Sequence, residues 1–140
     1  VTDFINIEIK NPSATHGELE QAVARAVSEA NADRRVLFSS FNPFSLTRLS
    51  FLLPNVPRAL LVTEEPDPKN KIWLRQMWFG PFARPHLLHV DSRMITQDRL
   101  LDWKQRGFKV AAWTVNDHQR ARELIDWGVD SLISDEIFEL

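Results

Sequence analysis

The chain has no cysteine, only four glycines, a net charge of −2 and no long apolar run. Without cysteine it forms no disulfide and offers no thiolate. This fits a reducing compartment but is also common outside one, so localisation stays open with the cytoplasm slightly favoured. The small net charge gives no electrostatic reason to expect nucleic acid or an anionic membrane as a partner. No stretch approaches the roughly 20 apolar residues that span a bilayer, so no transmembrane segment is expected.

The 140 residues fit one domain spanning 1–140, and the hydrophobic content of 44% is that of an ordinary globular protein. Short apolar segments alternate with amphipathic segments of helix length. This alternation predicts strands at 5–10, 36–41, 59–62, 87–90, 109–115 and 129–135, and helices at 15–30, 43–52, 72–79, 97–106 and 118–127. The expected helix caps are Thr15 with Glu18 as a capping box, then Asn42, Thr96 and the pair Asn116-Asp117.

Strict alternation of strands and helices with short connections predicts a parallel α/β sheet. Two architectures fit this pattern: an open doubly wound sheet, and part of a (β/α)8 barrel. The glycines are isolated, so no Gly-rich phosphate loop follows any strand, and the open nucleotide-binding sheet is the weaker of the two. In a barrel the carboxyl ends of the strands form the face that carries the chemistry. Polar or bulky side chains at the predicted strand ends include Glu8, Lys10, Ser39, Ser40, Glu64, Asp91, Trp113, Asn116 and Asp135.

The first predicted strand carries the first functional candidates. Its isoleucines alternate with Asn6, Glu8 and Lys10, so one face is apolar and the other is charged. In a sheet covered on both faces, such charges are costly unless they pair, bind a metal or line a cavity. Because Glu8 and Lys10 point the same way, Glu8 could ligate a hard cation while Lys10 offsets the charge of a phosphate. A salt bridge to neighbouring strands is the alternative, and spacing alone does not decide between the two.

Trp113 lies near the carboxyl end of the fifth predicted strand, where an indole could wall a pocket or simply pack in the core. Asn116 and Asp117 need no explanation beyond helix capping. Asp135 could bind a ligand or start a last helical turn, and the helical turn is favoured.

The four histidines do not form a recognisable catalytic or metal-binding pattern. His16, His86 and His118 are expected at the surface, and His89, on a strand, is expected to be a core histidine with its hydrogen bonds satisfied. No two of them have metal-ligand spacing, and no Ser-His-Asp arrangement is suggested.

Four segments, in this order and at these separations, resemble the glycerophosphodiester phosphodiesterase (GDPD) family, and the resemblance covers essentially the whole chain. They are Asn6-Ile7-Glu8-Ile9-Lys10, Ser39-Ser40-Phe41, Trp113-Thr114-Val115-Asn116 and Gly128-Val129-Asp130-Ser131-Leu132-Ile133-Ser134-Asp135. Members of that family are TIM barrels that hydrolyse glycerophosphodiesters such as glycerophosphocholine to an alcohol and glycerol 3-phosphate, usually with a divalent metal. The resemblance implies a TIM (β/α)8 barrel of this type, here incomplete, with strands 3 to 8 and the intervening helices.

The resemblance also implies roles for three residues. Glu8 matches a carboxylate ligand of Mg²⁺ or Ca²⁺, Lys10 matches the lysine beside the phosphate, and Trp113 matches the aromatic residue near the glycerol moiety. No segment matches the family motifs that carry the catalytic histidines and the other metal ligands. The resemblance therefore implies an incomplete metal site and no catalytic residue within this chain. The last of the four segments, at 128–135, also departs from the family pattern, because Ser134 stands where threonine is usual and no proline follows Asp135.

The function implied is that of a metal-dependent phosphoric diester hydrolase of lipid and glycerol metabolism, acting on a small-molecule glycerophosphodiester and inactive as the isolated chain. Six strands of a barrel leave two strand edges unpaired, which predicts self-association through these edges. The alternative is a non-catalytic degenerate barrel that binds a phosphodiester or a partner chain.

Overall fold

The structure is a computed structural model that describes residues 4–65 and 85–137. Its elements, in chain order, are β1 (Ile5–Glu8), α1 (Glu18–Glu29), β2 (Val36–Ser40), α2 (Pro43–Leu52), β3 (Arg58–Val62), β4 (Leu87–Asp91), the short 3-10 helix η1 (Ser92–Met94), α5 (Gln97–Gln105), β5 (Lys109–Trp113), α6 (His118–Asp126) and β6 (Ser131–Leu132). Six strands thus occur where the sequence predicts them, although β1 ends at Glu8 and β6 has two residues only. The helix predicted at 72–79 lies outside the described residues. None of the described helices is long and apolar enough to cross a membrane.

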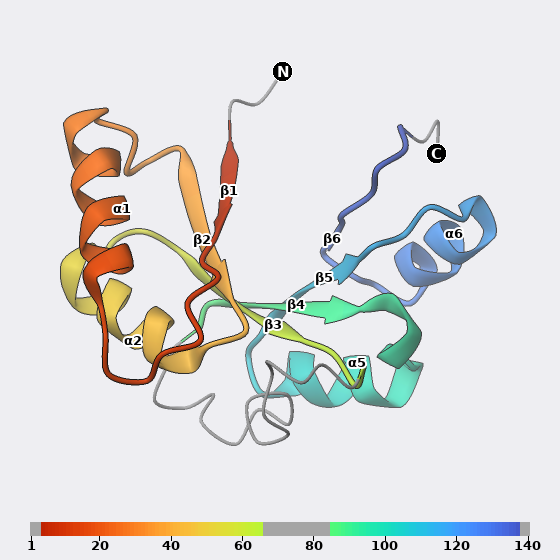
Figure 1. Cartoon of the computed structure of the whole chain (residues 1–140). Helices are drawn as coiled ribbons and strands as arrows, with labels where there is room; N and C mark the ends of the chain where they lie inside the picture. Colours follow the sequence, from red (N-terminus) through yellow and green to blue (C-terminus); the bar gives the residue numbers. More distant parts are fainter. Residues whose placement is uncertain (1–3, 66–84, 138–140) are drawn as a thin grey trace.

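All six strands are parallel, and their order in the sheet is β1-β2-β3-β4-β5-β6. Each strand therefore pairs with the next one in the chain (Figure 1). A doubly wound sheet reverses its strand order at a switch point, whereas a barrel keeps the order sequential. The sheet order thus favours part of a barrel over the open sheet.

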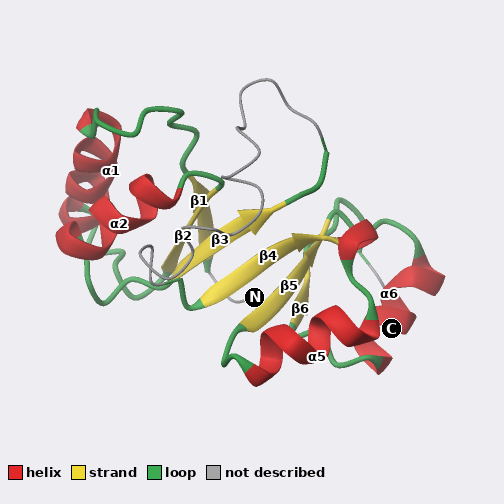
Figure 2. Cartoon of the chain, turned by 90° about the horizontal axis from the view of Figure 1, so that it is seen from below, coloured by secondary structure: helices red, strands yellow, loops and turns green. Residues whose placement is uncertain are grey.

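The helices cover one face of this sheet, α1 and α2 beside β1 to β3, and α5 and α6 beside β4 to β6 (Figure 2). Alternate side chains of each strand pack beneath the helices, in two apolar clusters. The cluster beneath α1 and α2 contains Ile9, Val27, Ala32, Val36, Phe38, Leu49 and Val56. The cluster beneath α5 and α6 contains Leu60, Val62, Leu88, Val90, Val110, Ala112 and Leu124, among others. The other side chains of each strand face the opposite, concave side of the sheet.

Three predicted helix caps are present. The side chain of Asn42 accepts a hydrogen bond from the Phe44 N–H (3.0 Å), Thr96 accepts from Arg99 N–H (3.3 Å), and Asp117 accepts from Arg120 N–H (2.7 Å). Each satisfies a backbone donor that the first helical turn leaves unpaired.

The capping box predicted at Thr15 is wrong. Helix α1 begins at Glu18 after Gly17 and has no side-chain cap. The preceding turn is held instead by the Ser13 hydroxyl, which accepts hydrogen bonds from the backbone N–H groups of Thr15 (3.2 Å) and His16 (2.9 Å). A hydroxyl that satisfies a local turn in this way competes with helix formation, so the helix starts later than the spacing predicts.

Candidate functional site

Glu8 and Lys10 lie where β1 ends and its loop begins. Ile7 and Ile9 pack with the apolar cluster beneath α1 and α2, so Glu8 and Lys10, which alternate with them, project from the concave side. The Lys10 Nζ lies 3.8 Å from the Glu8 Oε1, and the two side chains are 81% and 36% exposed. The two charges therefore pair with each other, and both remain accessible to a ligand.

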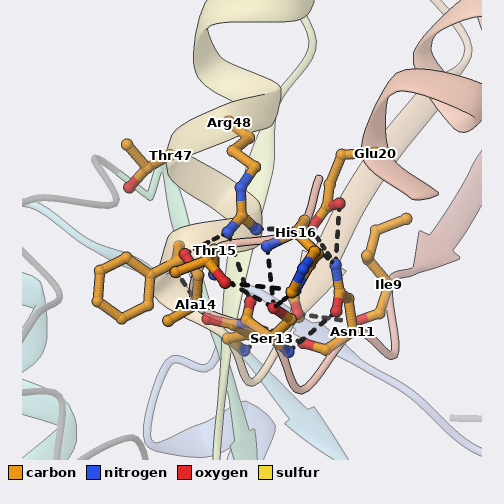
Figure 3. Close-up of polar contacts among 12 residues, drawn as sticks. Ile9, Asn11, Ser13, Ala14, Thr15, His16, Glu20, Thr47 and Arg48 are labelled. Carbon is orange, nitrogen blue, oxygen red and sulfur yellow. Dashed lines mark hydrogen bonds and ion pairs between the residues drawn. The ribbon is translucent and has the colours of Figure 1, made fainter. Parts of the chain in front are cut away.

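The loop after β1 is held by side chains from the end of β2 and from α2. Figure 3 shows Arg48 of α2 beside the residues of this loop. Ser40 Oγ donates to the Ile9 carbonyl (2.7 Å), and Asn42 Nδ2 donates to the carbonyls of Asn11 (2.7 Å) and Ser13 (2.9 Å). The Arg48 guanidinium donates to the carbonyl of Ala14 as well. These contacts order a loop that contains no regular secondary structure.

The same loop rests on a partly buried ion pair. The Glu20 side chain is completely buried, and its Oε1 lies 3.1 Å from Arg48 Nη1 and 3.0 Å from Asn11 Nδ2 (Figure 3). Although burial raises the pKa of Glu20, its hydrogen bonds and the charge of Arg48 lower the pKa below its ordinary value. Glu20 therefore stays ionised and has a structural role.

Trp113 lies at the carboxyl end of β5 and contacts Phe41, the residue that follows β2. Its ring centroid lies 5.9 Å from that of Phe41 in an edge-to-face arrangement with an interplanar angle of 81°. Its indole Nε1–H donates to the His89 carbonyl (2.8 Å). The sequence resemblance includes Phe41 in a motif but predicts no contact for it. The carboxyl ends of β2 and β5 thus lie close together although the two strands are not neighbours in the sheet.

His89 is buried in the sheet, as expected, but the prediction that its hydrogen bonds are satisfied is wrong. The side chain is 3% exposed and its Nδ1 has no hydrogen-bond partner among the described residues. Burial lowers the pKa of His89 to about 4, because the charged imidazolium is poorly solvated there. The buried hydroxyl of Ser39, on the same concave side, also has no hydrogen-bond partner within the described part of the chain. His89 is therefore a neutral group near neutral pH.

Asp91, at the end of β4, has its carboxylate occupied. It accepts hydrogen bonds from the Thr63 hydroxyl (3.0 Å), the Arg93 backbone N–H (3.0 Å) and the Arg93 Nε (2.9 Å). Burial raises the pKa of Asp91, but the hydrogen bonds from Arg93 and Thr63 outweigh it and lower the pKa. With both of its oxygens engaged in hydrogen bonds, the Asp91 carboxylate orders the loops after β3 and β4.

Asn116 does not cap α6. Its Oδ1 accepts hydrogen bonds from the Ser134 hydroxyl (3.1 Å) and the Asp135 backbone N–H (3.0 Å), and its Nδ2 donates to the Asp135 carboxylate (3.1 Å). The loops that follow β5 and β6 are joined by these bonds. Asp135 is thus exposed and paired with an amide, and the described residues after it form no helical turn.

A divalent metal, implied by the resemblance, finds an incomplete set of ligands in the described part of the chain. No group of three or more His, Asp or Glu side chains there could hold a metal ion. Glu8 alone supplies one carboxylate, which is also paired with Lys10. Mg²⁺ and Ca²⁺ take about six or more oxygen ligands, so Glu8 fits as one member of a site and not as a site by itself.

The sequence and fold of the chain are similar to those of known proteins. The model of the Glycerophosphoryl diester phosphodiesterase family matches residues 1–139. A glycerophosphodiester phosphodiesterase of Caldanaerobacter subterraneus subsp. tengcongensis is 29% identical over 136 residues, which are 96% of this chain and 53% of that protein. An Oleispira antarctica phosphodiesterase, solved in complex with the product sn-glycerol-3-phosphate, is 28% identical with a TM-score of 0.68, covering 94% of this chain and 51% of the other.

The fold is also shared with a solved protein of Silicibacter pomeroyi, with a TM-score of 0.77 at 23% identity, covering 94% of this chain and 47% of that one. The chain spans about half the length of the curated relatives it matches. Together with the sequential parallel sheet, these likenesses confirm the predicted fold class, an incomplete TIM (β/α)8 barrel.

Proposed function

Because the chain belongs to the glycerophosphoryl diester phosphodiesterase family, we propose that it supplies part of the active site of a metal-dependent hydrolase. The reaction is the hydrolysis of a glycerophosphodiester to an alcohol and glycerol 3-phosphate. The observation that carries the proposal is the accessible Glu8–Lys10 pair at the carboxyl end of β1. That end belongs to the same edge of the sheet as Trp113 and Phe41, and in barrel enzymes this edge carries the chemistry.

Each proposed residue has a distinct role. Lys10 offers an exposed ammonium that neutralises a phosphate oxygen. Glu8 offers one oxygen ligand to Mg²⁺ or Ca²⁺, and such a metal, when bound, polarises the phosphoryl group. Trp113 offers an apolar wall to the glycerol carbons, and its orientation is supported by Phe41 and by the hydrogen bond to the His89 carbonyl.

Proton transfer is not assigned to the histidines of this chain. The His16 ring lies 3.0 Å from the Ser13 hydroxyl, and the His86 ring accepts a hydrogen bond from the Arg58 N–H (3.2 Å). His89 is buried and neutral, and His118 starts helix α6. Leaving-group protonation needs a positioned acid within hydrogen-bond reach of the substrate. We therefore expect the isolated chain to bind the product without catalysing turnover.

Binding tests the proposed site directly. The wild-type chain is titrated with sn-glycerol 3-phosphate and with inorganic phosphate, and binding is followed by NMR chemical shifts. Lys10→Ala is expected to weaken both ligands by roughly tenfold, whereas Trp113→Ala weakens glycerol 3-phosphate only. Lys109→Ala, which removes the same charge at the opposite end of β5, is the matched control and leaves both affinities unchanged. Failure of the wild-type chain to bind either ligand contradicts the proposal.

Turnover and assembly are tested separately. Glycerophosphocholine with Mg²⁺ or Ca²⁺ is expected to be stable in the presence of the isolated chain, and robust hydrolysis contradicts the inference that this chain's histidines do not transfer the proton. Light scattering measures the oligomeric state, because β1 and β6 end the described sheet with unpaired edges that favour self-association.

The second candidate function is a non-catalytic module that binds a phosphodiester or a partner chain. It is supported by the absence of a three-ligand metal group among the described residues. Both candidate functions predict binding of glycerol 3-phosphate, so the oligomeric state separates them: a stable, well-folded monomer favours the module, and aggregation favours an incomplete enzyme.

A further inference from the structure

The backbone on both sides of Lys10 is held by two side chains that follow one another closely at the end of β2. The Ile9 carbonyl accepts a hydrogen bond from Ser40 Oγ (2.7 Å), and the Asn11 carbonyl accepts one from Asn42 Nδ2 (2.7 Å). The Ile9 N–H also donates to the Ser39 carbonyl (2.7 Å). Lys10 and Asn11 thus lie between two peptide groups that are held by hydrogen bonds.

These two side chains are shielded from solvent. Ser40 is fully buried and Asn42 is 5% exposed, so water competes little for their hydrogen bonds. Both are fixed in turn: Ser40 Oγ accepts from the Asn42 N–H (3.0 Å), and Asn42 Oδ1 accepts from the Phe44 N–H (3.0 Å). A continuous series of hydrogen bonds therefore runs from the first turn of α2 to the backbone around Lys10.

The Lys10 side chain needs such support. It is 81% exposed, and its ammonium lies 3.8 Å from Glu8, a loose contact for an ion pair. An exposed lysine is flexible, so the volume that its ammonium samples is limited chiefly by the position of its own backbone. Holding that backbone raises the local concentration of positive charge beside a bound anion.

We propose that Ser40 and Asn42 are positioning residues for Lys10, and that they order the end of β1 for anion binding. The inference rests on the proposed function, because it assumes that Lys10 contacts the phosphate. Phe41, between the two, alternates to the concave side and meets Trp113. The segment 40–42 thus supports the phosphate side of the site through its two polar residues and the glycerol side through its aromatic residue.

Two variants separate positioning from helix capping. Asn42→Asp keeps an oxygen that accepts from the Phe44 N–H but removes the amide donors to Asn11 and Ser13. Ser40→Ala removes the donor to the Ile9 carbonyl and the acceptor for the Asn42 N–H, and keeps the Asn42 oxygen that accepts from the Phe44 N–H. The matched control is Ser50→Ala, which deletes a hydroxyl that donates to the Thr47 carbonyl (2.6 Å) within α2.

Inorganic phosphate is the probe, with binding followed by NMR. Asn42→Asp and Ser40→Ala are each expected to weaken phosphate by about fivefold, because the ammonium samples more space, and Ser50→Ala leaves the affinity unchanged. In a Lys10→Ala background the two substitutions are expected to have no further effect. Amide hydrogen exchange of residues 9–13 is expected to accelerate in both variants, while that of β4 and β5 stays as in the wild type.

The results distinguish this inference from the proposed function. Wild-type affinity in both variants overturns the positioning role alone, as does an equal loss in the Lys10→Ala background. Absence of phosphate binding by the wild-type chain overturns the proposed function. It also overturns the proposal that Ser40 and Asn42 position Lys10 for anion binding. If one variant fails to fold, as judged by circular dichroism, the other decides the question.

Discussion

The indole Nε1–H of Trp113 donates a hydrogen bond to the backbone carbonyl of His89 at 2.8 Å. A side chain at the end of β5 is thereby fastened to the neighbouring strand, and the indole plane is fixed edge-to-face with the Phe41 ring. An aromatic wall that is held by a hydrogen bond keeps its shape before any ligand arrives, which lowers the entropic cost of binding.

The first prediction concerns this hydrogen bond. Trp113→Phe keeps an aromatic ring but removes the donor, so the free energy of unfolding is expected to fall by about 1 to 2 kcal/mol. Urea denaturation measures the change. Trp127→Phe is the control, because Trp127 packs beneath the Arg120 guanidinium (4.9 Å) and donates no such bond among the described residues. Equal losses for the two variants would contradict the argument.

The second prediction concerns the ion pair between the buried Glu20 and the partly buried Arg48. Arg48→Met leaves the fully buried Glu20 carboxylate without its cation and is expected to lower the free energy of unfolding by about 3 kcal/mol. Glu20→Gln in the same background makes the buried group neutral, so the double variant is expected to be more stable than Arg48→Met alone. Denaturation midpoints of the wild type, the two single variants and the double variant give the interaction energy. Additive losses would contradict a coupled pair.

Much of the fold could be predicted from the sequence because the pattern is local. Six apolar segments alternate with helices, and helix ends such as Gly107 (φ 87°) and Gly128 (φ 93°) adopt the left-handed conformation that glycine permits. The GDPD resemblance is also confirmed by the family match. The failed capping box at Thr15 has a local cause too, since the Ser13 hydroxyl offers the backbone a competing turn.

The contacts that hold the candidate site in place could not be predicted from local sequence patterns. Glu20 and Arg48 lie 28 residues apart, and Asn42 and Asn11 lie 31 apart, so their contacts depend on how α1 and α2 pack. Sequence spacing treats Asn42 only as a helix cap. In the structure the side-chain oxygen of Asn42 caps α2, and its amide nitrogen binds the loop after β1. Only the three-dimensional arrangement reveals this double role.

The third prediction uses Gly17, where the chain passes Arg48. A Cβ at Gly17 would lie 2.8 Å from Arg48 Cδ and 3.2 Å from Nε. Gly17→Ala is therefore expected to displace Arg48 and to lower the free energy of unfolding by about 1 to 3 kcal/mol. In an Arg48→Ala background the same substitution is expected to cost little, and thermal unfolding measures both. Gly107→Ala is the contrast. Apart from the adjoining residues of the chain, none of the described residues has an atom within 4 Å of a Cβ at Gly107. The cost of this substitution comes from φ and is expected to be the same in either background.

The fourth prediction concerns the pH dependence of stability through His89. Burial lowers the pKa of His89 to about 4 in the folded protein, against 6.5 for an unperturbed histidine. Between these values the unfolded chain binds the proton and the folded chain does not, so stability is lost as the pH falls from 6.5 to 4. The loss expected from this group is about 3 kcal/mol, complete near pH 4.

Other titratable groups also contribute to the pH dependence of stability. Burial, followed by the charge of Arg58, also lowers the pKa of His86, which adds a loss of the same sign in the same range. Asp91 and Glu20 have lowered pKa values, so their contributions are lost at pH values below their unfolded range. His89→Gln is therefore expected to flatten the dependence between pH 6.5 and 4.5 only partly. Urea unfolding across this range measures the slopes, and an unchanged slope in His89→Gln would show that the imidazole is already protonated in the folded chain or reaches water.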